Sequence, residues 1–126
     1  MRRKILAPIA ASACVLMLAN TAHAAGAAQG ALPEPLATGQ KVYEHWCAPC
    51  HDGGPGHPGT QSLQLKYKGQ VPATLLERTD LIPATVVLYV RQGVLLMAPF
   101  RKTEITDAEL NALAAYVVRN YRSERK

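Results

Sequence analysis

Two cysteines and a histidine lie within five residues of one another, in the order Cys47-Ala48-Pro49-Cys50-His51. Thiols at this spacing can add to the two vinyl groups of one haem, and the adjacent imidazole can then coordinate the iron. The C-x-x-C-H pattern is therefore the attachment signature of a c-type haem. The same pattern also occurs as the redox dithiol of thioredoxin-like enzymes, so the surrounding sequence has to separate the two interpretations.

A haem iron bound by one histidine needs a sixth ligand or an open site. Met97 is the candidate, because the other two methionines, Met1 and Met17, lie in an N-terminal segment that we expect to be removed. A thioether ligand favours reduced iron and raises its potential, as an electron carrier requires. His45 and His57 are the competing ligands, and we expect them to be surface or supporting histidines.

The N-terminal segment has the pattern of a secretory signal peptide. A basic start at 2–4 precedes an apolar run over 5–18, and an A-x-A cleavage site ends at Ala24. We therefore predict a signal peptide over residues 1–24, cleavage near Ala24 and a periplasmic location. The apolar run is too short for a membrane span.

Charge and cysteine content narrow the remaining possibilities. The net charge of +5 falls once the three basic residues of the signal are removed, so the surplus does not argue for nucleic acid. Cys14 leaves with the signal, and only Cys47 and Cys50 remain. A tetrahedral zinc site would want more ligands, and a disulfide framework would want a second pair. A covalent haem would supply the staple that a small exported domain needs.

The remaining chain predicts an all-α domain of three to five helices over 38–126, after a flexible lead-in over 25–37. Thr38 is the expected N-cap of a helix from about 39 to 46 that delivers Cys47 to the haem. Glycines and prolines over 52–60 exclude a helix and allow the backbone to approach a flat ligand. We expect a carbonyl of this loop to accept the Nδ1–H of His51.

Further helices are expected downstream. Pro72 opens a short helix to about Arg78, and a clearer helix has Pro83 in its first turn and Gly93 as its stop. Thr106 begins the last helix in a capping box, T-D-A-E. An apolar stripe at i, i+3, i+4 and i+7 then faces the core, made by Leu110, Leu113, Ala114 and Val117.

Two sets of side chains are candidates for supporting a haem. Four apolar residues beside Met97 are expected to keep water from its sulfur: Leu95, Leu96, Ala98 and Phe100. Three arginines are candidates for pairing with haem propionates or with a partner: Arg78, Arg91 and Arg101.

The chain resembles the class I c-type cytochromes over about 39–121. The motifs that carry the resemblance are Gly39-x-x-x-Tyr43-x-x-x-Cys47-x-x-Cys50-His51, Gly93-x-x-x-Met97 and Leu113-x-x-Tyr116-Val117. The resemblance implies one covalent haem c with His51 and Met97 as its axial ligands. It also implies that the first and last helices cross, with Gly39 and Tyr43 against Leu113 and Tyr116.

A narrower resemblance is to the cytochrome subunits of p-cresol methylhydroxylase-type flavocytochromes. It is carried by the segments at 66–69, 77–81, 90–93 and 100–105. The resemblance implies docking on an FAD flavoprotein that dehydrogenates 4-alkylphenols, eugenol among related substrates. Electrons would pass singly to this chain and on to a copper protein or another cytochrome, so the polypeptide alone would not be an enzyme. Proline tends to follow the ligand methionine directly in these subunits, whereas Ala98 intervenes here.

Two other functions remain as alternatives. A freely diffusing respiratory cytochrome c would keep the haem and lack the flavoprotein. A thiol–disulfide oxidoreductase would use Cys47 and Cys50 as a dithiol, but it requires a strand immediately before the motif. The sequence there predicts a helix instead.

Overall fold

The computed structural model of the chain describes residues 32–121, and the expected signal peptide, its cleavage site at Ala24 and the last five residues lie outside that range. The regular elements over 32–121 are helices, and Val94 and Met97 form one isolated bridge there. The all-α prediction is confirmed. The elements are α1 (Leu36–Val42), a π-helix (Tyr43–Cys47), α2 (Ala48–His51), α3 (Pro58–Tyr67), a 3₁₀ turn (Leu75–Glu77), α4 (Pro83–Gln92) and α5 (Asp107–Val117).

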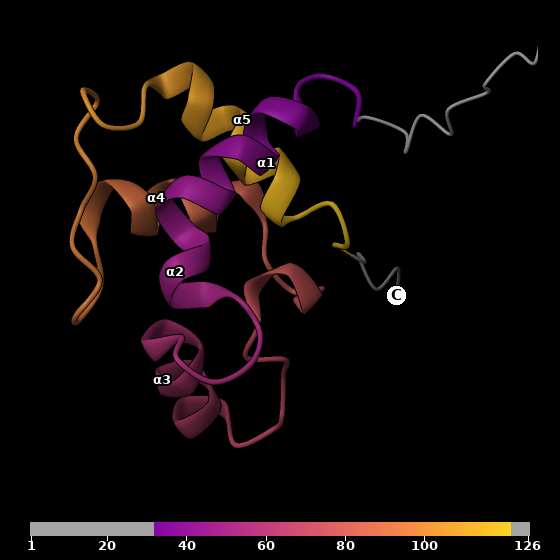
Figure 1. The fold of residues 1–126 in the computed structure, drawn as a ribbon, viewed down its shortest axis with the longest axis vertical. Helices are drawn as coiled ribbons and strands as arrows, with labels where there is room; N and C mark the ends of the chain where they lie inside the picture. The colour runs from indigo at the N-terminus through magenta and orange to yellow at the C-terminus, as the bar shows by residue number, and fades with distance from the viewer. Residues whose placement is uncertain (1–31, 122–126) are drawn as a thin grey trace, which may run out of the picture.

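The first three helical segments follow one another without a break from 36 to 51, as Figure 1 shows. The predicted cap at Thr38 is wrong, because α1 begins at Leu36 and Thr38 lies inside it. The carbonyl of Pro33 accepts the amides of Leu36 and Ala37 at 2.8 and 3.2 Å, and this backbone turn starts the helix earlier. None of the helices over 32–121 is long and apolar enough to cross a membrane.

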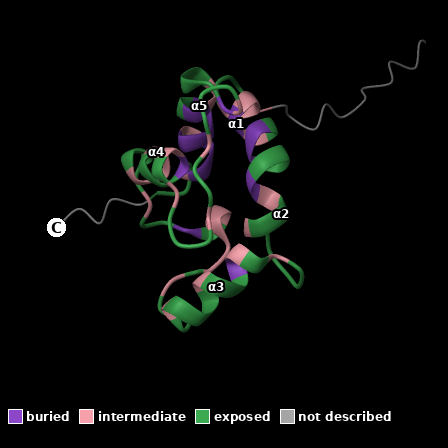
Figure 2. Ribbon diagram, turned by 90° about the vertical axis from the view of Figure 1, so that its left-hand side faces the viewer, coloured by how far each residue is buried: buried purple, intermediate pink, exposed green. Residues whose placement is uncertain are grey.

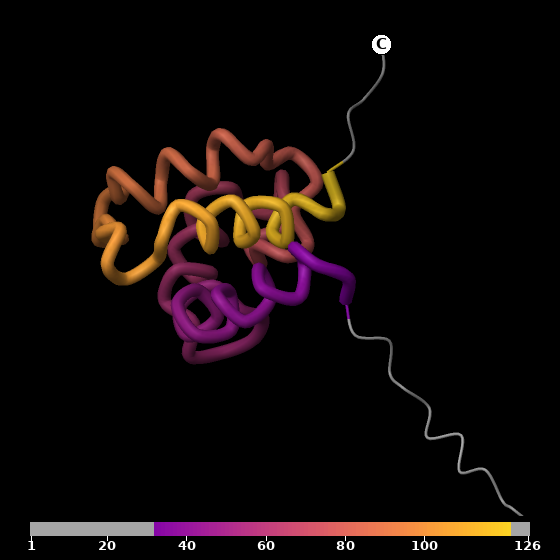
Figure 3. Tube along the Cα trace, turned by 90° about the horizontal axis from the view of Figure 1, so that it is seen from above, coloured from indigo at the N-terminus to yellow at the C-terminus, as the bar shows by residue number. Residues whose placement is uncertain are grey.

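The core lies where α5 passes between α1 and α4 (Figure 3). Each residue of the predicted stripe on α5 is buried, and Tyr43 lies against Tyr116 with 5.8 Å between ring centroids. Gly39 is the closest point of the crossing, since a Cβ atom there would overlap the carbonyl of Ala112 and lie 2.7 Å from Tyr116 Cβ. The crossing implied by the resemblance is therefore present, with the backbone of Ala112 as the closest contact.

The boundaries of α4 and α5 match the sequence signals. Pro83 occupies the first turn of α4, where its missing amide hydrogen costs nothing, and Gly93 follows the last residue with φ +70°. The Thr106 hydroxyl accepts the Glu109 amide, while the Glu109 carboxylate accepts the Thr106 amide at 2.8 Å. The predicted capping box is confirmed.

Two segments differ from their predictions. The loop expected over 52–60 ends at His57, because Pro58 is at the start of α3, where proline is tolerated. The helix expected from Pro72 to Arg78 shortens to the 3₁₀ turn at Leu75–Glu77. In Figure 2 the buried residues gather on α1 and α5, whereas α3 and the loops are mostly exposed.

Replacing Gly39 with alanine should lower the free energy of unfolding by about 2 kcal/mol. Alanine favours a helix by up to about 1 kcal/mol, but overlap with the Ala112 carbonyl outweighs that gain. Chemical denaturation of the purified protein followed by circular dichroism measures the change. Gly53→Ala is the matched control, because its Cβ would meet only Thr74 at 3.8 Å. Equal stability of the two variants would contradict the close crossing.

Candidate functional site

The two thiols lie at the junction between the π-helix and α2. Cys47 is the last residue of the π-helix and is 9% exposed, whereas Cys50 lies in α2 and is exposed. Neither cysteine is in a disulfide. A wider turn inside a helix is uncommon and often marks a functional site. Here the π-helix ends at Cys47, the first residue of the C-x-x-C-H motif.

The electrostatics of Cys47 do not suit a redox dithiol. Burial, with a smaller contribution from Cys50, raises the pKa of Cys47 to about 12. Thiol–disulfide exchange needs a cysteine that ionises readily, which is the opposite direction. The residues before Cys47 form a helix rather than a strand. Both observations count against a thiol–disulfide oxidoreductase.

The imidazole of His51 is held with one nitrogen against the backbone. Its Nδ1 is buried and has no hydrogen-bond partner among the described residues, so the expected loop carbonyl does not accept it. Gly59 occupies this side instead, where an added Cβ would lie 2.9 Å from Nδ1 and 2.7 Å from Cε1. Burial lowers the pKa of His51 and favours the neutral ring that binds metals. Nε2 is the nitrogen left to reach an iron.

Met97 is half-buried against the hydrophobic core at the end of a two-residue turn. The amide and carbonyl of Val94 and Met97 bond reciprocally, each at 2.9 Å. The turn projects the two residues between them, so Leu95 and Leu96 are 96% and 98% exposed. The expectation that these leucines shield Met97 is wrong.

Of the other two expected shielding residues, Ala98 is exposed and Phe100 is half-buried. Phe100 makes a contact that the sequence did not suggest. Its ring lies edge-on to Trp46, with 5.6 Å between centroids, and Trp46 directly precedes Cys47. This contact joins the segment that carries the cysteines to the segment that carries Met97. The sequence alone did not predict this pairing, because the two aromatic residues are far apart in the chain.

The competing histidines have other roles. His45 is exposed and lies edge-on to Trp46, with 4.6 Å between centroids. The Nδ1 of His57 lies within hydrogen-bond distance of the Ala48 and Pro49 carbonyls. Among residues 32–121, no three His, Cys, Asp or Glu side chains come together as a metal cluster.

Comparison with protein families gives one match. The family model described as cytochrome c oxidase, cbb3-type, subunit III matches residues 34–117. The chain belongs to this family of c-type cytochromes. No curated protein and no solved structure matches.

Membership of a cytochrome c family implies a covalent haem c, attached at Cys47 and Cys50, and a role in electron transfer. It also supports the class I cytochrome c fold expected from the motifs.

The chain's own residues fit such a group. Beside the core lies a set of half-buried apolar side chains whose exposed surface a flat macrocycle can cover: Leu75, Leu76, Leu81, Val86, Val87, Met97 and Phe100. Cys47 is part of the core cluster, and the buried Nδ1 of His51 leaves its other nitrogen for iron.

The three arginines expected near a haem have protein partners. Arg78 is 5% exposed and forms a two-pronged pair with Asp80 at 2.7 and 2.6 Å, while its guanidinium lies 4.7 Å from the Tyr67 ring centroid. The hydrogen bonds that Arg78 donates to Asp80 raise the pKa of Arg78 and lower the pKa of Asp80. Arg101 is exposed and pairs with Glu104 at 3.1 Å.

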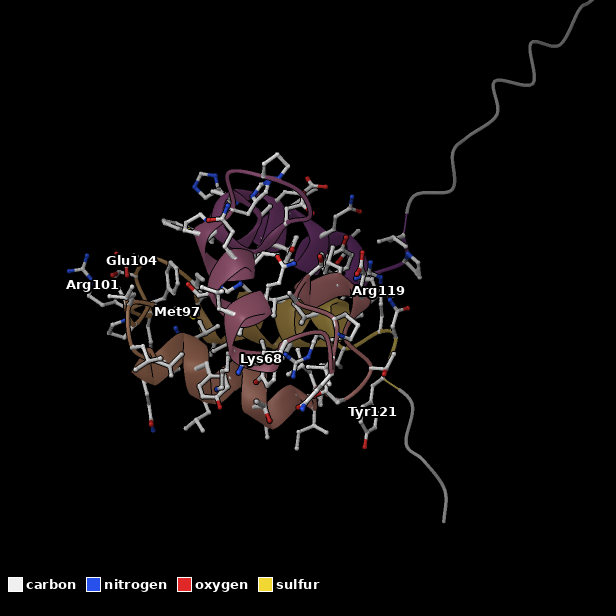
Figure 4. The ribbon with its side chains drawn as sticks, turned by 90° about the horizontal axis from the view of Figure 1, so that it is seen from below. Lys68, Met97, Arg101, Glu104, Arg119 and Tyr121 are labelled. Atoms are coloured by element: carbon white, nitrogen blue, oxygen red, sulfur yellow. The ribbon has the colours of Figure 1, made fainter. Side chains whose placement is uncertain are left out.

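Arg91 fixes the chain that follows Met97. It donates to the carbonyls of Phe100 and Ile105 at 3.1 and 2.8 Å, and to Asp107 at 2.9 Å. Figure 4 shows Met97 at the same end of the molecule as Arg101 and Glu104. Arg91 therefore ties the strap from Phe100 to Asp107 onto α4.

Arg91→Ala should lower the free energy of unfolding by about 2 kcal/mol, because two backbone carbonyls lose a charged donor. Denaturation followed by circular dichroism tests this. Arg101→Ala removes a guanidinium of the same kind that is 78% exposed, and its unfolding curve should overlay that of the unaltered protein. Equal effects of the two substitutions would show that Arg91 does not anchor the strap.

Proposed function

We propose that this chain is an exported, periplasmic one-electron carrier in which His51 and Met97 are the axial ligands of the haem iron. The observation that carries the proposal is the edge contact between Trp46 and Phe100 at 5.6 Å, because it brings the C-x-x-C-H segment and the Met97 segment together. A haem iron with imidazole and thioether ligands exchanges single electrons without binding substrate.

The two ligands are held by different means. His51 follows Cys50 in α2, and its ring is confined by Gly59. Met97 closes the reciprocal turn with Val94, and Pro99 stiffens the chain just beyond it. Met97 is the sole methionine after the expected cleavage site, so no other thioether competes for the position.

We further propose that electrons reach this chain from an FAD flavoprotein that dehydrogenates 4-alkylphenols. Support comes from the resemblance of the segments at 66–69, 77–81, 90–93 and 100–105 to flavocytochrome subunits. A copper protein or another cytochrome would then take the electrons. The alternative is a freely diffusing carrier. The description of the matched family names an oxidase subunit and makes no mention of a flavoprotein. Purification from the native source distinguishes the fixed subunit from the diffusing carrier, because a fixed subunit elutes with a larger flavin-containing chain.

The turn beside Met97 supplies a surface for such a partner. Leu95 and Leu96 project almost fully into solvent, and Leu95 has φ +53°, in the left-handed region that costs a non-glycine residue about 1 kcal/mol or more. Glycine is favoured at the first position of a two-residue turn with positive φ. An exposed leucine that is both apolar and strained is explained by an apolar recess on a partner. A partner docked there would lie one residue from Met97.

Met97→Ala should abolish the near-infrared charge-transfer band from sulfur to ferric iron, because the sulfur ligand is lost. The reduction potential should fall, because the thioether stabilises reduced iron. Absorption spectroscopy and a redox titration measure the two effects. Leu96→Ala, one residue away and fully exposed, is the control and should leave both unchanged. An unaltered band and potential in Met97→Ala would refute the assignment of the sixth ligand.

Leu95→Gly should raise stability slightly while weakening the complex with the flavoprotein. The substitution relieves the positive φ but removes an exposed side chain worth about 2 kcal/mol when buried, or about thirty-fold in affinity. Titration calorimetry with the co-purified flavoprotein measures affinity, and thermal denaturation measures stability.

Leu65→Ser provides the control for this docking surface, because Leu65 is a leucine on α3 that is 79% exposed. Its affinity should match that of the unaltered chain. Undiminished affinity of Leu95→Gly would place the docking surface elsewhere.

A further inference from the structure

The carbonyls at the end of the attachment helix have a donor from outside it. Carbonyls near the end of a helix are open to donors from outside it, even where one amide already bonds them, as the Asp52 amide bonds the Ala48 carbonyl. The Nδ1 of His57 lies 3.0 Å from the carbonyl of Ala48 and 3.2 Å from that of Pro49. Because both partners are acceptors, Nδ1 carries the proton and donates. His57 thus caps the turn between the two cysteines.

A second donor acts on the other side of the proximal histidine. The hydroxyl of Thr60, a residue that is 7% exposed, donates to the carbonyl of Asp52 at 2.9 Å. Between these two donors lies Gly59, whose Cβ position is 2.7 Å from the Cys50 carbonyl and 2.9 Å from His51 Nδ1. The start of α3 therefore contacts the attachment turn before, at and after His51.

We propose that His57 and Thr60 are positioning residues that fasten the start of α3 to the attachment turn and so hold Gly59 against the His51 ring. The backbone at Gly59 then packs close beside Nδ1 and Cε1 of the ring, with no room for a side chain between them, and this packing restricts rotation of the ring's plane. The inference rests on His51 being an iron ligand, which is part of the proposed function, and it does not depend on the flavoprotein.

This fastening would affect an iron held by His51. The plane of an axial imidazole sets its overlap with the iron d orbitals, so a ring free to rotate changes the electron paramagnetic resonance spectrum of the ferric protein. Loss of the His57 donor also removes one of two contacts that hold the Ala48 carbonyl in place, the other being the Asp52 amide at 3.0 Å. Loosening of the turn is therefore visible at the Asp52 amide independently of the iron.

The experiment compares His57→Leu with His57→Asn in the haem-loaded, full-length protein. Leucine removes the donor, and the asparagine amide can restore it because its nitrogen occupies a position similar to that of Nδ1. In His57→Leu, exchange of the Asp52 amide with deuterium should rise about five-fold, the factor supplied by one hydrogen bond of about 1 kcal/mol. The ferric resonance spectrum and the reduction potential should shift as well, and His57→Asn should recover all three.

Two further variants complete the design. His45→Leu is the matched control, since His45 is an exposed histidine near the same turn whose ring contacts Trp46, and all three measurements should be unchanged. Thr60→Val removes the second donor with little change of shape and should reproduce the effects of His57→Leu. If His57→Leu does not accumulate with haem, Thr60→Val carries the test.

Two results would overturn the inference. One is a resonance spectrum and potential of His57→Leu, or of Thr60→Val where it carries the test, identical to those of the unaltered protein. The other is failure of His57→Asn to recover what His57→Leu loses. A failure of the proposed His51 ligation is separate, because it would show in the unaltered protein as a ferric resonance spectrum without an imidazole ligand.

Discussion

The close crossing of α1 and α5 is the contact on which the rest of this fold depends. Because Gly39 has no side chain, α1 can approach the Ala112 carbonyl of α5 closely. The buried stripe of α5 then packs against Val42 and Tyr43. Most of the buried side chains belong to this crossing and to its contact with α4. The attachment turn, α3 and the Met97 turn extend from that core, so local contacts have to hold them in place.

The two ends of the site are constrained in different ways. On the side of the cysteines, donors from His57 and Thr60 fix backbone carbonyls, which sets the direction of the helix end. On the side of Met97, a strained two-residue turn and the carbonyl contacts of Arg91 fix the chain. A small domain buries a limited fraction of its surface, so a covalently held group that covers half-buried apolar side chains adds stability as well as chemistry.

Features that depend on a few neighbouring residues were predictable from the sequence. The capping box at Thr106, the proline start and glycine stop of α4, and the stripe on α5 follow from local rules and are all observed. Contacts between distant segments were not predictable. The apolar run that contains Leu95 and Leu96 indicated burial, but reciprocal backbone bonds turn both side chains outward.

The beginnings of α1 and α3 show a related limit. Helix α1 starts earlier than the expected cap at Thr38, because the Pro33 carbonyl lets the first turn form. Helix α3 starts inside the loop expected over 52–60, where the fixed φ of Pro58 suits a first turn. The acceptor expected for His51 Nδ1 is missing for a tertiary reason, since Gly59 occupies that side of the ring. Local patterns could therefore name candidate site residues, whereas the contacts that hold those residues in place were not predictable.

The charges beside the Met97 turn bear on the choice between a fixed subunit and a diffusing carrier. The four charged side chains of the segment 101–107 pair with one another or with Arg91, since Arg101 contacts Glu104 at 3.1 Å and Lys102 contacts Asp107 at 2.7 Å. Exposed pairs add little stability, but they cancel the field that would steer a distant partner. The exposed side chains next to Met97 are apolar, namely Leu95 and Leu96. Apolar contact gives persistence rather than rapid encounter, which is what the proposed docking on a flavoprotein would require.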